Sequence, residues 1–281
     1  MFLIALAVLA ASPATFESAF AAAKPGDTLR LIAGRYPLTI IRSRTFSPPL
    51  TVDASAATMT GIVLRDTSGI RWTGGVFDGS TLTVKSATDF GFAAYTGRNI
   101  TVTGVAFSAL RVGVVLDHIV GGEVSNSSFV GMRADGIDLA VSRSITITHN
   151  ACHNFRVDPG EHPDCIQAWS KPTDPPVADI VISGNSAIGT MQGISFFDGD
   201  VNGVAQGGFD RVSIFGNSVM NTMANGIAAY NCRGCTVRNN TVGSLPDYIY
   251  VSQLVVIGGS VAQCGNDVAM VPRQGTPPCR N

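Results

Sequence analysis

One short pattern recurs along most of this chain. Apolar and β-branched residues alternate with small polar ones and end at a turn, as in Ile145-Thr-Ile-Thr-His-Asn150 and Ile180-Val-Ile-Ser-Gly-Asn185. The equivalent turn positions are 105, 127, 150, 185, 217 and 240, with spacings of 22, 23, 35, 32 and 23 residues. A period near 22 residues with short strands is typical of a solenoid of stacked coils. Because Asn occupies this turn in four coils, we expect a ladder of stacked amides along the solenoid axis.

The composition fits one long folded unit and excludes other classes of protein. Of the 281 residues 14% are charged, 45% are hydrophobic and 31 are Gly, which fits a large core with many turns and excludes disorder. The net charge is −1 and no Lys/Arg cluster is present, so we expect no nucleic-acid partner. No apolar run reaches the ~18 residues of a membrane span, so no membrane partner is expected. The sequence does not indicate an oligomeric state.

The N-terminus divides into two parts. Residues 1–14 form a short apolar run that ends in small residues, which is typical of the end of a signal peptide cleaved after Ala14. A positive segment before this run is missing, so the alternatives are that the true start differs or that the run is a native apolar helix. Residues 15–23 carry apolar side chains at helical spacing. An amphipathic helix there would cover the open end of the first coil, and residues 15–281 are expected to form one domain.

A second strand-like segment follows each repeat, as in Gly136-Ile-Asp-Leu139 and Cys165-Ile-Gln-Ala-Trp169. Side chains alternate between the two faces of a strand. If the Ile residues of these segments point inward, Asp138 and Gln167 lie side by side on the outside. The outer surface of this sheet is therefore a candidate site.

The same outer surface is expected to carry three aromatic rings in register, Trp169, Phe197 and Tyr230. Exposed rings in a row are what a polysaccharide groove needs, because the C–H faces of sugars stack on them. The alternative is that the loops 155–164 and 198–209 cover the rings as a small satellite core.

Charge is concentrated between residues 133 and 164, which hold three of the four His residues and five carboxylates. The extra residues of the two long repeats fall in the segments 155–164, 171–178 and 198–209, which flank the second strands. Loops on a rigid scaffold are where sites are built. His162 precedes Pro163 and is expected in an extended, exposed loop, so it is the His with the strongest functional claim.

The six Cys residues, an even number, suit an exported protein with disulfides, either secreted or periplasmic. We expect Cys264 to pair with Cys279 and to tie down the C-terminal tail. Cys232 and Cys235 are expected to form either a small local disulfide or two buried thiols. No second Cys/His pair at ligand spacing supports a zinc site.

The order of motifs between residues 135 and 230 resembles that of the polygalacturonase family, which are glycoside hydrolases on a right-handed β-helix. The family pattern is N-T-D-G, D-D-C-I, G-H-G and R-I-K. The corresponding segments here are Arg133-Ala-Asp-Gly136, Pro163-Asp-Cys-Ile166, Met191-Gln-Gly193 and Ala228-Ala-Tyr230.

This resemblance keeps Asp135 and Asp164 but departs elsewhere. Gln192 stands at the family's His, and Ala228 and Tyr230 stand at the Arg and Lys that would hold a galacturonate carboxylate. From residue 15 to about 260 the chain resembles the wider pectin-lyase-like superfamily. That likeness implies an all-β fold, a single-stranded right-handed parallel β-helix with an N-terminal capping helix. It does not choose among lyases, epimerases, hydrolases and tailspikes.

The leading functional prediction is a polysaccharide lyase that cleaves a uronate-containing polysaccharide by β-elimination. A C5-epimerase, which shares the first step, is close to it. Proton abstraction beside a carboxylate needs a base, an acid and positive charge to stabilise the enolate. His162 and Tyr230 are the candidate base and acid, and the candidate cations are Arg133, Arg156 and Lys171.

Ca²⁺ is a possible alternative source of that positive charge, because hard oxygen ligands suit it. Asp158 and Glu161 are the main candidate ligands, and Asp135, Asp138 and Asp164 are further ones. The run from Asp158 to His162 is loosely similar to the D-P-H-D/E motif of mannuronan C5-epimerases, with an insertion.

Glycoside hydrolysis is the alternative chemistry, and it needs an acid and a base carboxyl about 6.5–9.5 Å apart for inversion. Asp135 or Asp138 would pair with Asp164 across neighbouring coils, which lie ~4.8 Å apart. The expected substrate-binding residues are Arg133, Arg156, Gln167, Trp169, Lys171, Gln192 and Phe197. A non-enzymatic glycan-binding solenoid is a third reading, which the clustering of charge disfavours.

Overall fold

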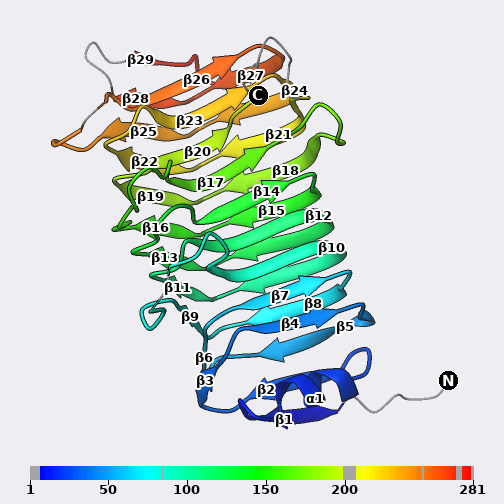
Figure 1. The fold of residues 1–281 in the computed structure, drawn as a ribbon. Helices are drawn as coiled ribbons and strands as arrows, with labels where there is room; N and C mark the ends of the chain where they lie inside the picture. The colour runs from blue at the N-terminus through cyan, green and yellow to red at the C-terminus, as the bar shows by residue number, and fades with distance from the viewer. Residues whose placement is uncertain (1–6, 84, 199–206, 249, 270–273, 280–281) are drawn as a thin grey trace.

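The computed structural model describes residues 7–83, 85–198, 207–248, 250–269 and 274–279, and they form a right-handed parallel β-helix (Figure 1). Each strand pairs in parallel with its equivalent in the next coil, for example Ile137 with Ile166 and Ile166 with Ile194. The predicted fold class is confirmed. A typical coil contributes three strands, so the solenoid has three faces.

The first face carries the candidate site, and two long strands join it to the second face. The joining strands are β10 (Phe90–Thr103) and β12 (Val112–Ser125). The other strands of the first face are β4 (Thr39–Arg42), β7 (Ile62–Arg65), β14 (Ile137–Ala140), β17 (Asp164–Trp169), β20 (Gln192–Phe196), β23 (Asn225–Tyr230) and β26 (Gln253–Ile257).

The second and third faces complete each coil. The second face also contains β1 (Val8–Ala11), β2 (Thr28–Leu31), β5 (Thr45–Asp53), β8 (Ser68–Thr73), β15 (Arg143–Thr148), β18 (Val177–Ser183), β21 (Phe209–Phe215), β24 (Cys232–Arg238) and β27 (Ser260–Cys264). The third face contains β3 (Gly34–Tyr36), β6 (Ala57–Met59), β9 (Val76–Asp78), β11 (Ala106–Ser108), β13 (Ser128–Val130), β16 (Ala151–His153), β19 (Ser186–Gly189), β22 (Ser218–Asn221), β25 (Thr241–Ser244), β28 (Asp267–Ala269) and the antiparallel β29 (Gln274–Gly275).

The core is built from rows of like residues stacked coil on coil. The Ile residues expected to point inward on the first face are buried, as are those of the second face. On the third face Phe77, Phe107 and Phe129 stack with centroids 5.2 and 4.9 Å apart. Burial of each large apolar side chain contributes about 2 kcal/mol, so the stacking of coils supplies most of the driving force.

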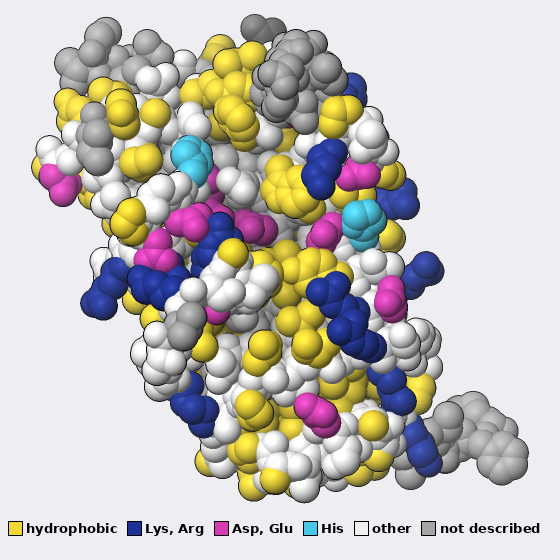
Figure 2. Space-filling view, in the orientation of Figure 1, with side chains coloured by type: hydrophobic (Ala, Val, Ile, Leu, Met, Phe, Trp, Pro, Cys, Tyr) yellow, Lys and Arg dark blue, Asp and Glu magenta, His cyan; other side chains and the backbone are white. Residues whose placement is uncertain are grey.

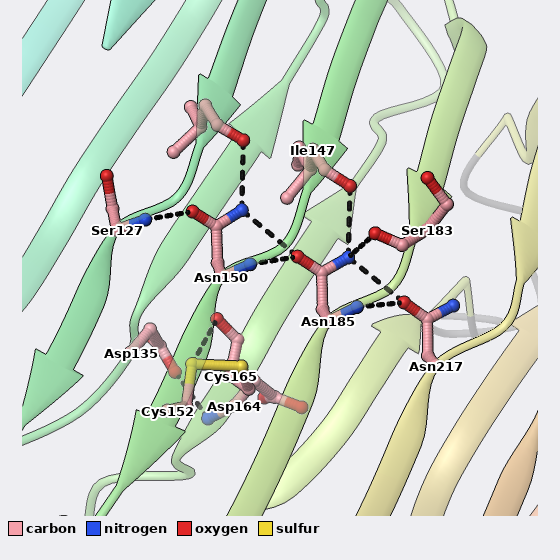
Figure 3. Close-up of a disulfide and its surroundings, with 11 residues drawn as sticks. Ser127, Asp135, Ile147, Asn150, Cys152, Asp164, Cys165, Ser183, Asn185 and Asn217 are labelled. Atoms are coloured by element: carbon pink, nitrogen blue, oxygen red, sulfur yellow. Dashed lines mark hydrogen bonds between the residues drawn. A yellow bond between two sulfur atoms is a disulfide. The ribbon is translucent and has the colours of Figure 1, made fainter. Parts of the chain in front are cut away.

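The predicted amide ladder is present at the turn between the second and third faces (Figure 3). The Oδ1 atom of Asn185 accepts hydrogen bonds from the backbone N–H and the Nδ2 of Asn150, at 2.9 and 3.0 Å. Asn185 in turn donates to Asn217, and the ladder continues through Asn240 to Asn266, one coil beyond the predicted positions. The residue before each ladder position has positive φ, and His149 (φ 54°) is one of these turn residues.

The expected capping helix is α1 (Phe16–Ala22). Phe16 and Phe20 are buried, and their rings contact Trp72 and Phe46 at 6.4 and 5.7 Å between centroids. Arg44 donates from Nη2 to the carbonyl oxygens of residues 21 and 23, which satisfies the end of the helix. The helix therefore closes the apolar end of the first coil, as predicted.

The structure places part of the expected targeting segment inside the fold. Residues 1–6 lie outside the described part of the chain, but Val8–Ala11 form β1, which pairs in parallel with β2. The alternative of an apolar helix is therefore wrong for these residues, because their backbone groups bond to the neighbouring strand. Ala11 is buried. Cleavage after Ala14 stays a prediction, and it would remove this strand. No helix of the described residues is long and apolar enough to cross a membrane.

All six Cys residues form disulfides. Cys264 bonds to Cys279 as expected, and Cys232 bonds to Cys235, which decides between the two alternatives for that pair. The third bond joins Cys152 to Cys165 inside the solenoid. It closes the loop between β16 and β17, the charged loop that the sequence singles out.

Candidate active site

Three aspartates meet on the outer surface of the first face. Asp135 lies two residues before β14, Asp138 lies within it, and Asp164 begins β17, the neighbouring strand of the next coil. The register pairs Asp138 with Gln167. The backbone N–H of Asp164 donates to Oδ1 of Asp135 at 2.8 Å, so these two residues are in direct contact. Figure 2 shows acidic side chains gathered in a hollow of this face, with basic ones beside them.

Three side chains converge on the carboxylate of Asp164, which is fully buried. Ser195 donates its hydroxyl to Oδ1, and Gln167 donates from Nε2 to Oδ2 at 2.9 Å. The Nδ1 atom of His162 lies 3.3 Å from the same Oδ2. Donors on both oxygens fix the orientation of this carboxylate.

The surroundings of Asp138 differ from those of Asp164, because no donor meets its buried oxygen. Its Oδ1 atom is buried and has no hydrogen-bond partner. Burial raises the pKa of Asp138 well above its ordinary range, and the nearby charges of Asp135 and Asp164 act in the same direction. Burial therefore favours the protonated form of Asp138, which lies in the same site as the hydrogen-bonded carboxylate of Asp164.

Asp135 lies between these two extremes. Burial, and then the charge of Asp164, raise its pKa to about 7, against the opposing effects of the Asp164 N–H and of Arg111. Arg111 also approaches the site through its backbone, because its carbonyl oxygen accepts the N–H groups of Ala134 and Asp135 at 3.0 and 3.1 Å.

His162 reaches this cluster from the loop between β16 and β17. Its ring contacts Gln192 as well as Asp164, and its side chain is 65% exposed. The hydrogen bond to Asp164 is the main cause that raises the pKa of His162. Gln192 occupies the position of the His in the polygalacturonase pattern, so the imidazole comes here from the preceding coil. His149 and His153 lie outside this cluster, with His149 in a ladder turn.

The disulfide between Cys152 and Cys165 holds the base of this loop (Figure 3). Cys165 follows Asp164 directly, and Figure 3 shows Asp135 and Asp164 beside the bond. The bond closes a loop with a sequence separation of 13 residues. It therefore restrains both a catalytic candidate on β17 and the loop that carries His162.

The predicted cations do not reach the carboxyls as free charges. Arg133 is nearly buried and forms ion pairs with Asp89 at 2.5 Å and with Asp158 at 2.7 Å. Arg156 lines a pocket beside Lys85 and Arg133, which no residue of the Asp135, Asp138 and Asp164 cluster lines. Lys171 lies with its Nζ 4.9 Å from the ring centroid of Trp169, a cation–π contact away from the carboxyls.

The two main candidates for Ca²⁺ ligands are held by basic side chains. Asp158 bonds to Lys85 and Arg133, and Glu161 forms a bidentate pair with Arg111 at 2.8 Å for both bonds. Their oxygens are thus already occupied by positive charge. Among the described residues no group of three or more His, Cys, Asp or Glu side chains is placed to hold a metal. Asp158 and Glu161 therefore do not fit Ca²⁺ in this arrangement, and a requirement for Ca²⁺ stays a prediction.

The three predicted rings form a row on the outer surface. Trp169 is next to Ala140 in the register, and the rings of Phe197 and Tyr230 lie 4.9 Å apart between centroids. Phe197 is 52% exposed, while Trp169 and Tyr230 are half-buried. Tyr230 is about five residues along the sheet from the level of Asp164, on the order of 15 Å. It is therefore not next to His162, and the two do not form an acid–base pair across one bond. Loop residues 199–206 lie outside the described part of the chain.

The main partners that the sequence did not reveal are Arg111, Asp89, Lys85 and Ser195. Arg111 and Glu161 are separated by 50 residues, and Arg133 and Asp89 by 44. No local sequence pattern indicates ion pairs between residues so far apart in the chain. Ser195 had a usable signal, because it falls in register with Gln167 on the outer face of the next strand.

Comparisons with known proteins agree with this fold. Residues 51–248 match the family model described as a right handed beta helix region. A comparison with curated protein sequences finds no match. The structure is similar to an alginate lyase from Paenibacillus sp. str. FPU-7 (13% identity, 92% of this chain and 99% of that chain, TM-score 0.54).

Two further solved structures show the range of chemistry on this scaffold. One is a polygalacturonase from Erwinia carotovora ssp. carotovora (17% identity, 84% of this chain and 76% of that chain, TM-score 0.55). The other is the A-module of a mannuronan C-5 epimerase from Azotobacter vinelandii (13% identity, 96% and 91%, TM-score 0.51). The chain belongs to the right-handed β-helix family. At these identities the likeness establishes the fold, and the activity has to be argued from the site.

Proposed function

We propose that this protein is a glycoside hydrolase that acts on a polysaccharide. The observation that carries the proposal is the contrast between two neighbouring carboxyls. Asp138 has a buried oxygen without a partner and a raised pKa, whereas Asp164 receives three side-chain contacts. Hydrolysis of a glycosidic bond needs one carboxyl that carries a proton and another that is ionised.

In the proposed reaction Asp138 donates its proton to the glycosidic oxygen as the C–O bond breaks. Asp164 accepts a proton from the water that attacks the sugar carbon, and the new O–H group remains on the sugar. Ser195 and Gln167 keep the Asp164 carboxylate oriented. Asp135, in contact with the backbone of Asp164, raises the pKa of Asp138 by its own charge.

Elimination is the second candidate, and His162 is the observation that favours it. An exposed imidazole beside a carboxylate is a suitable proton carrier. Its raised pKa, however, favours the protonated ring, which is the wrong state for a base. Elimination also needs positive charge beside the substrate carboxylate, and Arg111 and Arg133 are held in ion pairs. These facts support the proposal of hydrolysis over elimination.

The row of rings supports a polymeric substrate. Phe197 and Tyr230 pack against each other and Lys171 packs on Trp169, which makes a firm surface for the C–H faces of sugars. The row lies along the same face as the carboxyls, so one extended chain would contact both. The three disulfides support an exported protein, secreted or periplasmic.

The test is to incubate the purified protein with a panel of neutral and acidic polysaccharides and to measure two products. New reducing ends report hydrolysis or elimination, and ultraviolet absorbance of an unsaturated uronate reports elimination alone. We expect reducing ends without absorbance, and about a 10²–10⁴-fold lower rate in Asp138→Asn. Asp210→Asn, in an ion pair with Arg233 on the second face, is the matched control and should retain the rate. Absorbance that rises with the reducing ends, or an Asp138→Asn variant of full activity, would refute the proposal.

A further inference from the structure

The positive charge that surrounds the candidate active site is already matched by carboxylates. Arg111 donates hydrogen bonds from Nε and Nη2 to the two carboxylate oxygens of Glu161, both at 2.8 Å. Arg111 is also the cation that lowers the pKa values of Asp135 and Asp138. The guanidinium beside the cleavage point is thus held by a bidentate bond, the strongest common arrangement for such a pair.

The basic side chains farther from the three aspartates are also held in ion pairs. Arg133 divides its two terminal nitrogens between Asp89 and Asp158, and Lys85 bonds the second oxygen of Asp158. Three cations (Lys85, Arg111 and Arg133) therefore face three carboxylates (Asp89, Asp158 and Glu161). This leaves the Asp135, Asp138 and Asp164 cluster with His162 as its nearest cation, and His162 is already engaged by Asp164.

Arg156 and Lys171, two of the predicted substrate-binding cations, have no carboxylate partner among the ion pairs of the described residues and lie away from the three aspartates. Arg156 opens onto the pocket formed by residues after β9, β11 and β13, and none of the three aspartates lines it. Lys171 lies over the Trp169 ring, beyond the end of β17. The positions 228 and 230 hold a buried Ala and a Tyr packed on Phe197.

We propose that the sugar whose glycosidic bond is cleaved carries no negative charge, so that the substrate is neutral at the cleavage point. This inference rests on the proposed hydrolysis. A uronate carboxylate seated beside Asp135 and Asp164 would meet like charge at short range, and the cations Lys85, Arg111 and Arg133 are already held by carboxylates. Such an arrangement acts against acidic sugars in the same way that unpaired charges exclude wrong partners at interfaces.

The inference is tested by binding, which does not require turnover. Matched pairs of oligosaccharides would be prepared from oligogalacturonate, oligoglucuronate and oligomannuronate by reduction of the carboxyl groups, so that each pair differs only in charge. Affinities would be measured at low salt with the Asp138→Asn protein. The prediction concerns the oligosaccharide pair with the highest affinity. In that pair we expect the neutral member to bind about tenfold more tightly than the acidic member, or better. Equal or tighter binding of the acidic member overturns the inference.

One substitution sharpens the test. Glu161→Gln releases Arg111 from its bidentate partner, so the preference for the neutral oligosaccharide should fall about tenfold or reverse. The control is Asp179→Asn, which releases Arg211 from a bidentate pair of the same kind on the second face and should leave the preference unchanged. An unchanged preference in Glu161→Gln overturns the inference.

The outcomes separate this inference from the proposed function. Mass spectrometry of the products of active protein identifies the sugar at each new reducing end. A neutral sugar there supports both proposals. A uronic acid at the new reducing end, formed without ultraviolet absorbance, retains the hydrolase and overturns the neutral cleavage point. Cleavage by elimination overturns the hydrolase, while the binding preference still decides the charge at the site.

Discussion

The amide ladder and the carboxyl cluster lie on the same coils but follow opposite rules. At the ladder, Asn150, Asn185 and Asn217 are identical residues, and each amide bonds to the coil on either side. At the cluster, neighbouring coils present different residues, and Asp138 leaves a buried oxygen without a partner. A solenoid stabilises itself by repeating satisfied contacts. The place where the repetition stops and a polar group remains unsatisfied is where we locate chemistry.

The largest effect on stability is expected at the ladder. In Asn185→Ala the backbone N–H of Asn150 loses its acceptor, and the carbonyl of Ile147 loses a donor. Unsatisfied buried groups of this kind cost about 1–3 kcal/mol each, so the free energy of unfolding should fall by about 4 kcal/mol. Denaturant unfolding measures this, with the exposed Gln263→Ala as control. Loss of less than about 1 kcal/mol would contradict the role of the ladder.

The second prediction compares two disulfides that close loops of similar length. Both should contribute to stability, but only one should affect activity. Replacing Cys152 and Cys165 by Ser, or Cys264 and Cys279 by Ser, opens loops with separations of 13 and 15 residues. Each change should cost about 3 kcal/mol of unfolding free energy. Only the first should also lower the hydrolytic rate, because it frees the loop that carries His162. Equal activity in the two variants at a temperature where both are folded would argue against that restraint.

The third prediction concerns the pH dependence of stability at the cluster. The pKa of Asp135 is about 7 in the folded protein and near 3.8 in the unfolded chain. The folded state therefore binds more protons between these values, and stability falls as pH rises from about 4 to about 7. Asp135→Asn removes this titration and keeps an oxygen for the Asp164 N–H. The variant should be more stable than the natural protein by about 2 kcal/mol at pH 8, with little difference at pH 4. A variant that is less stable at both pH values would contradict the burial of this charge.

The smallest effect is expected at the rings. Phe197→Ala removes one exposed sugar platform and should weaken the binding of an oligosaccharide about fivefold, close to 1 kcal/mol, with kcat preserved. Phe215→Ala, which removes a ring stacked with Arg238 on the second face, is the control. If Phe197→Ala lowers kcat and leaves affinity intact, the rings are not a binding platform.

The sequence predicts the parts of this structure that depend on local patterns. The 22-residue period, the Asn turns and the spacing of Phe16 and Phe20 each reflect a rule that acts within one coil or one helix, and the structure confirms them. Asp138 and Asp164 could also be predicted as site residues. The strand pattern places Asp138 on the outer face of a strand and Asp164 at the start of the next one. What could not be predicted is how charges pair across coils.

Those pairings bear directly on the proposed function. The sequence predicts Arg133 as a cation for the substrate and Glu161 as a metal ligand. In the structure, both are satisfied by partners 25 to 50 residues away. The protonation states of Asp135 and Asp138 depend on burial and on each other, and neither quantity is encoded in a motif. The list of residues predicts elimination, whereas the way their charges pair is the basis on which we propose hydrolysis.

The central claim is that Asp138 is a protonated acid in the resting protein, and it can be measured directly. The carboxyl carbon of Asp138 would be followed by NMR across a pH titration of protein labelled at Asp, with Asp138→Asn to assign the signal. The account predicts that the Asp138 signal stays in its protonated position well above pH 3.8 and changes only at much higher pH. A signal that titrates near 3.8, like an ordinary exposed aspartate, would contradict the account.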